Sequence, residues 1–393
     1  MENLLSEGIK ATPPSFVRGI LKAAADSQII SFAGGLPNPV SFPQDDLLLS
    51  MERIVKKYGS NVFQYSITAG LPELRQYIAD RYNRKYNLKL TIDNIIITTG
   101  SQQALDLIGK VLLNKNDGVI VEKPTYLAAI QAFSLQQPVF YPVELTQEGL
   151  NPEQLKKALQ NNIKFIYTIP NFQNPTGLTY SAENRKQIFE ILKDTDVVLI
   201  EDDPYGELRF DGKTLPYIGA GKLTNSILLG TFSKTVTPGM RIGFIISENT
   251  ELLKYISIAK EASDLHSNIF SQYLIWDYLI HNEYDHHIVK IKDLYQKQAQ
   301  AMIHAMDKYF PKTVEYTKPD GGMFLWVTLP EGISAMELFP KALDRKVAFV
   351  PGDPFYTDIE NANTMRLNYT NADCQTIEEG IRRLGALLKN LNK

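Results

Sequence analysis

Short apolar runs alternate with amphipathic ones through the middle of the chain, starting near residue 92. NIIITTG precedes SQQALDLIGKVLLN, and GVIVE precedes YLAAIQAFSLQ, so each strand-like run leads into a helix-like one. The strand-like series continues with PVFYPVEL, IKFIYTIP and VVLIEDDPY, with helical patterns between them. This alternation predicts an α/β fold with a doubly wound, mostly parallel sheet, whose ligands bind beyond the carboxyl ends of the strands.

The length of the chain predicts a second, smaller unit. At 393 residues the chain exceeds the size at which a single hydrophobic core stops growing. After about residue 250 helical patterns dominate, and the strand-like GGMFLWVTLP then begins a smaller αβ unit. We expect a large domain over residues 46–295, a small C-terminal domain over 296–393, and an N-terminal segment, 1–45, that packs on the small domain.

Charge and cysteine content narrow the class of protein. The net charge is -3 and the basic residues are scattered, which argues against a nucleic-acid partner and favours small molecules. The single cysteine, Cys374, cannot form an internal disulfide and fits a reducing compartment. The sequence contains no run of about 18 apolar residues and its start lacks a signal-peptide pattern, so we expect no membrane span and a cytoplasmic location.

The stretch GTFSKTVTPGMRIGF, residues 230–244, lies between two strand-like runs, 225–229 and 241–247. It contains Lys234 among Thr, Pro and Gly residues. Two interpretations compete: a solvated lysine in a loop, or an amine held in a dry pocket for covalent chemistry. The stretch alone does not choose between them.

Polar residues follow three further strand-like runs. TTGSQQALDLIG opens a helix whose free N–H groups favour an anion, although Ser101 could be an ordinary N-cap. EDDPYGELRF could be a capped polar turn, and PNFQNPTG could be ordinary turn punctuation. All of them fall at the carboxyl ends of successive strands, so they converge on one crevice.

These stretches also match a known set in the same order. GSQQAL, PTY at 124–126, NFQNPTG, EDDPY, TFSKTVTPGMRIG and MRLNYT at 365–370 resemble those of the fold-type-I pyridoxal-phosphate aminotransferases. The resemblance extends along nearly the whole chain. ISFAGGLPNPVSFP and QYSITAGLPELR resemble the branch that includes 2-aminoadipate, kynurenine and aromatic aminotransferases.

The resemblance implies roles around the ring of pyridoxal 5'-phosphate. Lys234 would form the Schiff base with the cofactor and later move the substrate proton. Asp202 would keep the pyridine nitrogen protonated, because a nearby carboxylate favours the cationic ring. Tyr205 and Asn174 would hydrogen-bond the ring oxygen, and Tyr126 would stack on the ring face.

The resemblance implies a phosphate site as well. An arginine suits it through charge-assisted hydrogen bonds, and the loops contribute backbone N–H groups. The residues implied are Ser101, Gln102, Thr231, Ser233 and Arg241.

The resemblance also implies residues that bind the substrate. Arg366 would clamp the α-carboxylate, Asn174 would lie beside it, and Gly35 would leave room for close backbone approach. Arg366 could instead pair with an acid of the protein. Arg18 would either meet the distal part of the substrate or be a helix-surface cation, and the sequence leaves both open.

Two other groups of residues have competing interpretations. Successive strand side chains face opposite ways, so only one of two adjacent acids reaches the ring; the spacing to Tyr205 favours Asp202 and makes Asp203 structural. His281, His286 and His287 lie between two helical patterns, which favours a solvated helix junction over a metal site.

In the family that the chain resembles, a tyrosine at the place of Tyr65 reaches the cofactor phosphate of the other subunit. The resemblance therefore implies a homodimer with shared active sites. The alternative is a tyrosine that packs within its own chain, before a helix that begins near Leu71.

The function implied is transamination between an amino acid, such as 2-aminoadipate or an aromatic one, and a keto acid such as 2-oxoglutarate. A pyridoxal-phosphate carbon–sulfur β-lyase is the alternative enzyme, because it uses similar residues on the same fold. A regulator with a DNA-binding module is disfavoured, because only about thirty residues, not basic ones, precede SFAGGLPNP.

Overall fold

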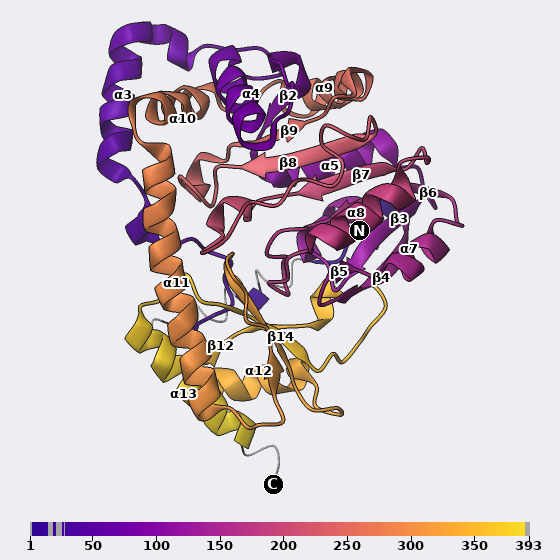
Figure 1. Cartoon of the computed structure of the whole chain (residues 1–393), viewed down its shortest axis with the longest axis vertical. Coiled ribbons are helices and arrows are strands. Elements are labelled where there is room, and N and C mark those ends of the chain that lie inside the picture. The colour runs from indigo at the N-terminus through magenta and orange to yellow at the C-terminus, as the bar shows by residue number, and fades with distance from the viewer. Residues whose placement is uncertain (1, 15–18, 21–25, 27, 390–393) are drawn as a thin grey trace.

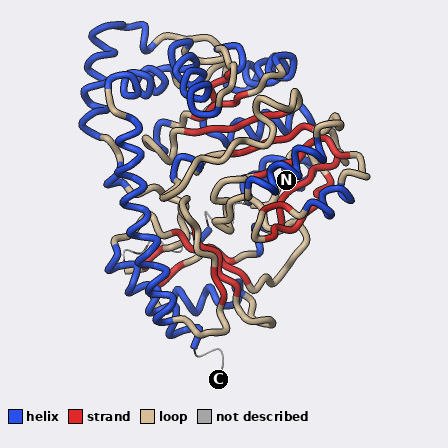
Figure 2. The backbone as a smooth tube through the Cα atoms, in the orientation of Figure 1, coloured by secondary structure: helices blue, strands red, loops and turns tan. Residues whose placement is uncertain are grey.

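Two β-sheets organise the chain in the computed structural model, which describes residues 2–14, 19, 20, 26 and 28–389 (Figure 1). The larger sheet has eight strands and the smaller has four. Figure 2 shows the strands in red with blue helices around them. The strands of the larger sheet are β2 (Ile95–Thr98), β3 (Gly118–Lys123), β4 (Val139–Thr146), β5 (Gly149–Leu150), β6 (Ile163–Thr168), β7 (Val198–Asp202), β8 (Ser226–Thr231) and β9 (Gly243–Ile246).

The larger sheet has the strand order β2-β9-β8-β7-β6-β3-β4-β5. The strands β8, β7, β6, β3 and β4 are mutually parallel, whereas β9 runs antiparallel to both β2 and β8, and β5 runs antiparallel to β4. The expected doubly wound, mostly parallel sheet is thus confirmed. Its parallel strands end at one edge, where their polar residues meet.

Helices cover both faces of this sheet. Successive strand residues point to opposite sides, so apolar side chains project from both faces and pack against helices. The α-helices of the described residues are α1 (Glu7–Ala11), α3 (Gln44–Tyr58), α4 (Pro72–Tyr86), α5 (Gly100–Leu112), α6 (Leu127–Ser134), α7 (Pro152–Ala158), α8 (Ala182–Leu192), α9 (Thr250–Asp264), α10 (Ile269–His281), α11 (Tyr284–Tyr309), α12 (Ala335–Asp344) and α13 (Cys374–Lys389). Val119 and Val121 of β3 pack in a cluster with α5, α6 and α9. Ile120, between them, faces the other way, toward α7 and α8.

The smaller sheet has the order β10-β11-β14-β13, entirely antiparallel. Its strands are β10 (Glu315–Tyr316), β11 (Phe324–Thr328), β13 (Val350–Pro351) and β14 (Thr364–Asn368). In addition, β1 (Ile30–Ser31) pairs in parallel with β12 (Val347–Ala348), which ties the N-terminal segment to this part of the molecule. The domain limits stay predictions.

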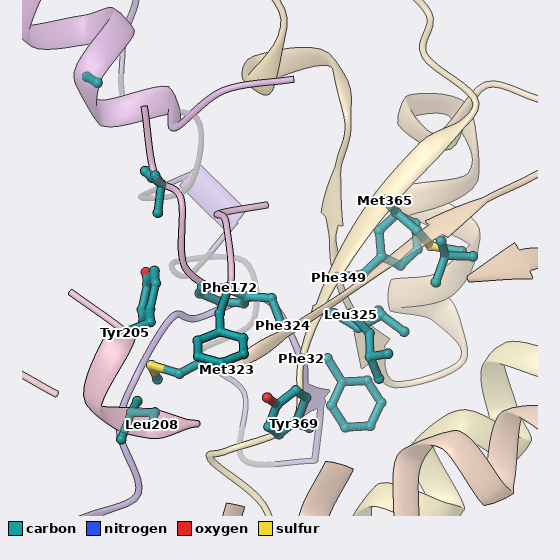
Figure 3. Packing of buried hydrophobic residues seen from close by; sticks show 14 of the residues in the cluster. Phe32, Phe172, Tyr205, Leu208, Met323, Phe324, Leu325, Phe349, Met365 and Tyr369 are labelled. Atoms are coloured by element: carbon teal, nitrogen blue, oxygen red, sulfur yellow. The ribbon is translucent and has the colours of Figure 1, made fainter. Parts of the chain in front are cut away.

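The two parts share a continuous core. The long helix α11 runs from the larger part to the smaller one, where it packs against α13 (Figure 1). Figure 3 shows Phe172, Tyr205 and Leu208, from loops that follow the large sheet, beside Met323 and Phe324 of the smaller part. This packing fixes the smaller sheet opposite the carboxyl edge of the larger one.

Within the described part of the chain, no helix is both long and apolar enough to cross a membrane. The same residues include no group of three or more His, Cys, Asp or Glu side chains placed to hold a metal ion. His281, His286 and His287 lie at the end of α10 and the start of α11, where His281 and His286 lie near Asp277 and Glu283.

Candidate active site

One cavity of about 310 Å³ lies at the carboxyl ends of the parallel strands, between the two sheets. Its walls come from loops that follow β2, β3, β6, β7 and β8, from β14, and from the N-terminal segment. The predicted site residues that line it are Gly35, Ser101, Gln102, Tyr126, Asn174, Asp202, Tyr205, Thr231, Ser233, Lys234, Arg241 and Arg366.

Lys234 lies in the turn after β8, with its side chain in the cavity wall. Its Nζ donates a hydrogen bond to the carbonyl oxygen of Gly35 at 2.9 Å. Burial, and after it the positive charges of Arg366 and Arg241, lower the pKa of Lys234 to about 8. About a tenth of the amine is therefore neutral, and nucleophilic, at pH 7, far more than for a lysine with an ordinary pKa.

Asp202 is the last residue of β7 and is 2% exposed. Its Oδ2 accepts a hydrogen bond from the Tyr167 hydroxyl at 2.8 Å, whereas its Oδ1 has no partner. Burial, together with the negative charges of Asp203 and Glu122, raises the pKa of Asp202 to about 7, although the hydrogen bond from Tyr167 acts in the opposite direction. A cationic group in the cavity would lower the pKa of Asp202 again, because it stabilises the ionised carboxylate.

Asp203 faces away from the cavity, as the alternation of a strand requires. Its Oδ1 accepts hydrogen bonds from the Asn171 side chain at 3.0 Å and from the Gly206 backbone N–H at 2.9 Å. Its Oδ2 accepts one from the Tyr217 hydroxyl at 2.6 Å. The carboxylate is thus occupied in holding the turn after β7.

Arg366 lies in the central strand β14 and is 3% exposed. Its two terminal nitrogens donate to Asn174 Oδ1 and to the Ala33 carbonyl oxygen, each at 2.8 Å, and its Nε has no partner. The guanidinium lies over the Phe324 ring at 4.3 Å, and burial lowers the pKa of Arg366 to about 10. A buried cation without a carboxylate partner is suited to a ligand carboxylate.

Asn174 joins this arginine to the next side chain of the site. Its Oδ1 accepts the bond from Arg366, and its Nδ2 donates to the Tyr205 hydroxyl at 3.4 Å. Tyr205 in turn packs edge-on against Phe324, with ring centroids 5.8 Å apart. Asn174 and Tyr205 are both buried, and both come from loops of the larger part that contact the smaller part.

The start of α5 approaches Arg241 closely, and two glycines make this possible. Gly100 has φ +72°, and a Cβ there would lie 2.5 Å from Arg241 Nη2. A Cβ on Gly243 would lie 2.8 Å from the Ser101 backbone nitrogen. Ser101 Oγ is buried without a partner, so a helix N-terminus, an arginine and a free hydroxyl meet in an anion-binding arrangement.

One predicted site residue, Tyr65, does not line this cavity. Tyr65 is 80% exposed and lies edge-on to His266, with ring centroids 5.9 Å apart. Arg18 lies outside the described residues.

Several residues of the site are not singled out by the sequence motifs. Tyr167 holds Asp202, and Ile169 and Phe324 line the cavity wall. Tyr167 and Ile169 stand in the apolar run IKFIYTIP, which reads as core. Their position at the carboxyl end of a strand was the available signal.

A ring with a basic nitrogen, an aldehyde and a phosphate fits this cavity. The unpartnered Oδ1 of Asp202 suits the protonated ring nitrogen, and the amine of Lys234 suits the aldehyde. The anion-binding start of α5 suits the phosphate. The fold and the site together define a pyridoxal-phosphate-dependent enzyme of fold type I.

The chain belongs to the family described as aminotransferase class I and II, whose family model matches residues 43–384. It is 40% identical over 395 residues to aromatic-amino-acid aminotransferase 1 of Thermococcus litoralis, which covers 99% of this chain and 94% of the relative. The protein is therefore an aminotransferase, and pyridoxal 5'-phosphate is its cofactor.

Two solved structures are similar over the whole chain. The α-aminoadipate aminotransferase of Thermus thermophilus, complexed with N-(5'-phosphopyridoxyl)-L-leucine, has a TM-score of 0.93 and 39% identity, over 100% of this chain and 98% of that one. The kynurenine aminotransferase of Pyrococcus horikoshii has a TM-score of 0.94 and 41% identity, over 100% and 98%.

Proposed function

We propose that this enzyme transfers the amino group of 2-aminoadipate, an aromatic amino acid or a similar donor to 2-oxoglutarate. The observation that carries the proposal is the buried guanidinium of Arg366, which faces the same cavity as the amine of Lys234. Every amino donor and keto acceptor has an α-carboxylate, so one arginine serves both halves of the reaction. The names of the similar proteins support this range of donors.

The residues of this chain divide the work in the following way. Arg366, oriented by Asn174 and the Ala33 carbonyl, would bind the α-carboxylate and hold the substrate Cα near Lys234. Lys234 Nζ would take the Cα proton and return it to the aldehyde-derived carbon of the cofactor, a role that suits its lowered pKa. Pyridoxal phosphate supplies the electron sink that makes this proton acidic.

The cofactor would be held at both ends. Asp202 would pair with the ring nitrogen, Tyr205 and Asn174 with the ring oxygen, and Tyr126 with the ring face. The phosphate would bind between the start of α5 and the turn after β8. Its ligands would be Ser101, Gln102, Thr231, Ser233 and Arg241.

We also propose a homodimer in which Tyr65 completes the phosphate site of the other subunit. In the single chain Tyr65 is exposed, and so are its apolar neighbours Phe63 and Ile67, at 67% and 51%. Exposed apolar side chains grouped in one loop favour a protein contact. A phenol fits the task, because its ring packs while its hydroxyl donates to an anion.

A screen of amino acids against 2-oxoglutarate, with glutamate formation as the readout, tests the proposed function. We expect glutamate with 2-aminoadipate or aromatic donors, together with the corresponding keto acid. Release of pyruvate and ammonia from a sulfur amino acid without any keto-acid acceptor would instead establish a β-lyase and overturn the proposal.

A further inference from the structure

Lys260 on α9 is a completely buried lysine, 0% exposed, outside the cavity. Its Nζ donates to Asp264 Oδ1 at 2.8 Å, to Gln103 Oε1 at 3.0 Å and to Ser267 Oγ at 3.0 Å. A buried ammonium is costly to desolvate, and three hydrogen bonds satisfy its three N–H groups. These contacts join α9 to α5, the neighbouring helix (Figure 1).

The same network holds the residue at which α5 begins. The backbone N–H of Thr99, the N-cap residue, donates to Gln103 Oε1 at 2.8 Å. The Thr99 hydroxyl lies 3.2 Å from Asp264 Oδ2 and 3.0 Å from Ser267 Oγ. Gln103 Nε2 donates to Asp264 Oδ2 at 2.6 Å, so five side chains form one closed set.

This arrangement keeps the helix terminus free of its own cap. Threonine at an N-cap normally accepts a hydrogen bond from the second or third amide of the helix. Thr99 makes no such bond, because its hydroxyl is directed to Asp264 and Ser267. The first amides of α5 therefore remain available at the cavity, where Ser101 and Gln102 lie.

Lys260 also balances the charge of Asp264. This carboxylate lies one hydrogen bond from Thr99, next to the terminus that we assign to the cofactor phosphate. Without the ammonium, Asp264 would present an unbalanced negative charge there and would repel an anion. Lys260 thus affects the N-terminus of α5 in two ways: it orients the side chains around Thr99, and it balances the charge of Asp264.

We propose that Lys260 is a positioning residue for the cofactor phosphate. It holds Thr99, Gln103 and Asp264 so that the first amides of α5 stay free of a side-chain cap and the negative charge of Asp264 stays balanced. This inference rests on the proposed placement of the phosphate at α5. The ammonium itself touches neither cofactor nor substrate. Its effect should therefore be confined to ligands that carry a phosphate.

The test measures equilibrium binding of pyridoxal phosphate and of pyridoxal, which lacks the phosphate, to cofactor-free protein. The variant Lys260→Met removes the charge with little change in length. Lys254→Met, an exposed lysine on the same helix, is the matched control. Lys260→Met combined with Asp264→Asn removes the unbalanced charge.

We expect Lys260→Met to weaken pyridoxal phosphate binding about tenfold or more, the range typical of residues that orient a ligand-binding group. Pyridoxal binding should change less than about twofold, and Lys254→Met should change neither. The Asp264→Asn combination should recover part of the loss. If Lys260→Met does not fold, Lys260→Gln, which keeps a donor without the charge, should show the same phosphate-specific loss.

Equal losses for both ligands, or no loss for either, would overturn the positioning role. A wild-type protein that binds both ligands equally well would instead contradict the placement of the phosphate at α5. The two failures are therefore distinguishable.

Discussion

Three basic side chains and a carboxylate in one cavity set the chemistry at the scale of single residues. The positive charges of Arg366 and Arg241 add to the effect of burial in lowering the pKa of Lys234, so both arginines favour its neutral, nucleophilic form. Asp202 has the opposite environment, with burial and two acids that raise its pKa. Each group is poised for a ligand of opposite charge.

The two adjacent acids after β7 should differ sharply in their effect on rate. Asp202→Asn should lower turnover by about a hundredfold or more, because the ring nitrogen loses its anionic partner in a buried site. Asp203→Asn should leave turnover of the folded protein much closer to wild type, since Asp203 bonds Tyr217 and Gly206. Steady-state rates of both variants provide the check, and the reverse order would show that the wrong acid was assigned.

Asp202 should also make the cofactor-free protein less stable as pH rises. The pKa of an aspartate is about 3.9 when unfolded and about 7 here, so the unfolded state loses its proton first. The contribution of Asp202 to stability is full below about pH 4 and is lost as pH rises through about 7.

Asp202→Asn removes this dependence while keeping an acceptor for Tyr167. The Tm of the cofactor-free variant should therefore exceed that of wild type above about pH 7, and the gap should close toward about pH 4. Thermal unfolding at several pH values measures it. A gap that does not change with pH would contradict the raised pKa of Asp202.

At the scale of elements, the site depends on where strands end. The sequence pattern predicted a strand over 225–229 and a second from 241, and the structure has β8 over Ser226–Thr231 and β9 over Gly243–Ile246. Arg241 could not be excluded from the second strand by pattern, because its left-handed conformation, φ 56°, comes from the turn before it. Arg241 therefore lies in the turn between the two strands, where its side chain meets the start of α5.

The motifs predicted which residues gather in the cavity, but not what supports them. Tyr167, Phe324 and Lys260 are ordinary members of an apolar run or a helix in the sequence, and only packing shows which group each contacts. The expected boundary between the large and small domains, at residue 295, falls inside α11. This one amphipathic helix packs at its start in an apolar cluster of the larger part and further on in the core that the two parts share.

Gly100→Ala tests the close approach of α5 to Arg241. The new Cβ would meet Arg241 Nη2 and would place alanine at φ +72°, so we expect a stability loss of about 1 kcal/mol or more. Pyridoxal phosphate should also bind more weakly, because Arg241 must move. Gly239→Ala is the control, since the nearest atom to a Cβ there is 3.9 Å away. Equal effects of the two changes would contradict the argument.

At the scale of the whole molecule, the N-terminal segment joins the two parts at the cavity. The Ala33 carbonyl accepts from Arg366 of the smaller sheet, and the Gly35 carbonyl accepts from Lys234 of the larger one. A Cβ on Gly35 would lie 3.1 Å from Phe324, so the segment fits closely over the site. Both cations are thus held through one short stretch of backbone.

The shared-site dimer predicts that two inactive chains restore activity together. Lys234→Ala and Tyr65→Ala should each be inactive or nearly so. A heterodimer of the two contains one intact site, which combines Lys234 of the second chain with Tyr65 of the first. Activity of purified heterodimers measures the effect. Heterodimers without recovered activity, or a fully active monomer, would contradict the shared site.

The central claim is that the cavity around Lys234 exchanges amino groups by way of pyridoxal phosphate. The most direct test is a single half-reaction followed by visible absorption, with purified holoenzyme, an amino donor and no acceptor. We expect that the absorption of the bound cofactor disappears as keto acid forms, returns on addition of 2-oxoglutarate, and is unchanged by the donor in Lys234→Ala. A protein that binds no cofactor, or one that turns the donor over repeatedly without an acceptor, would contradict it.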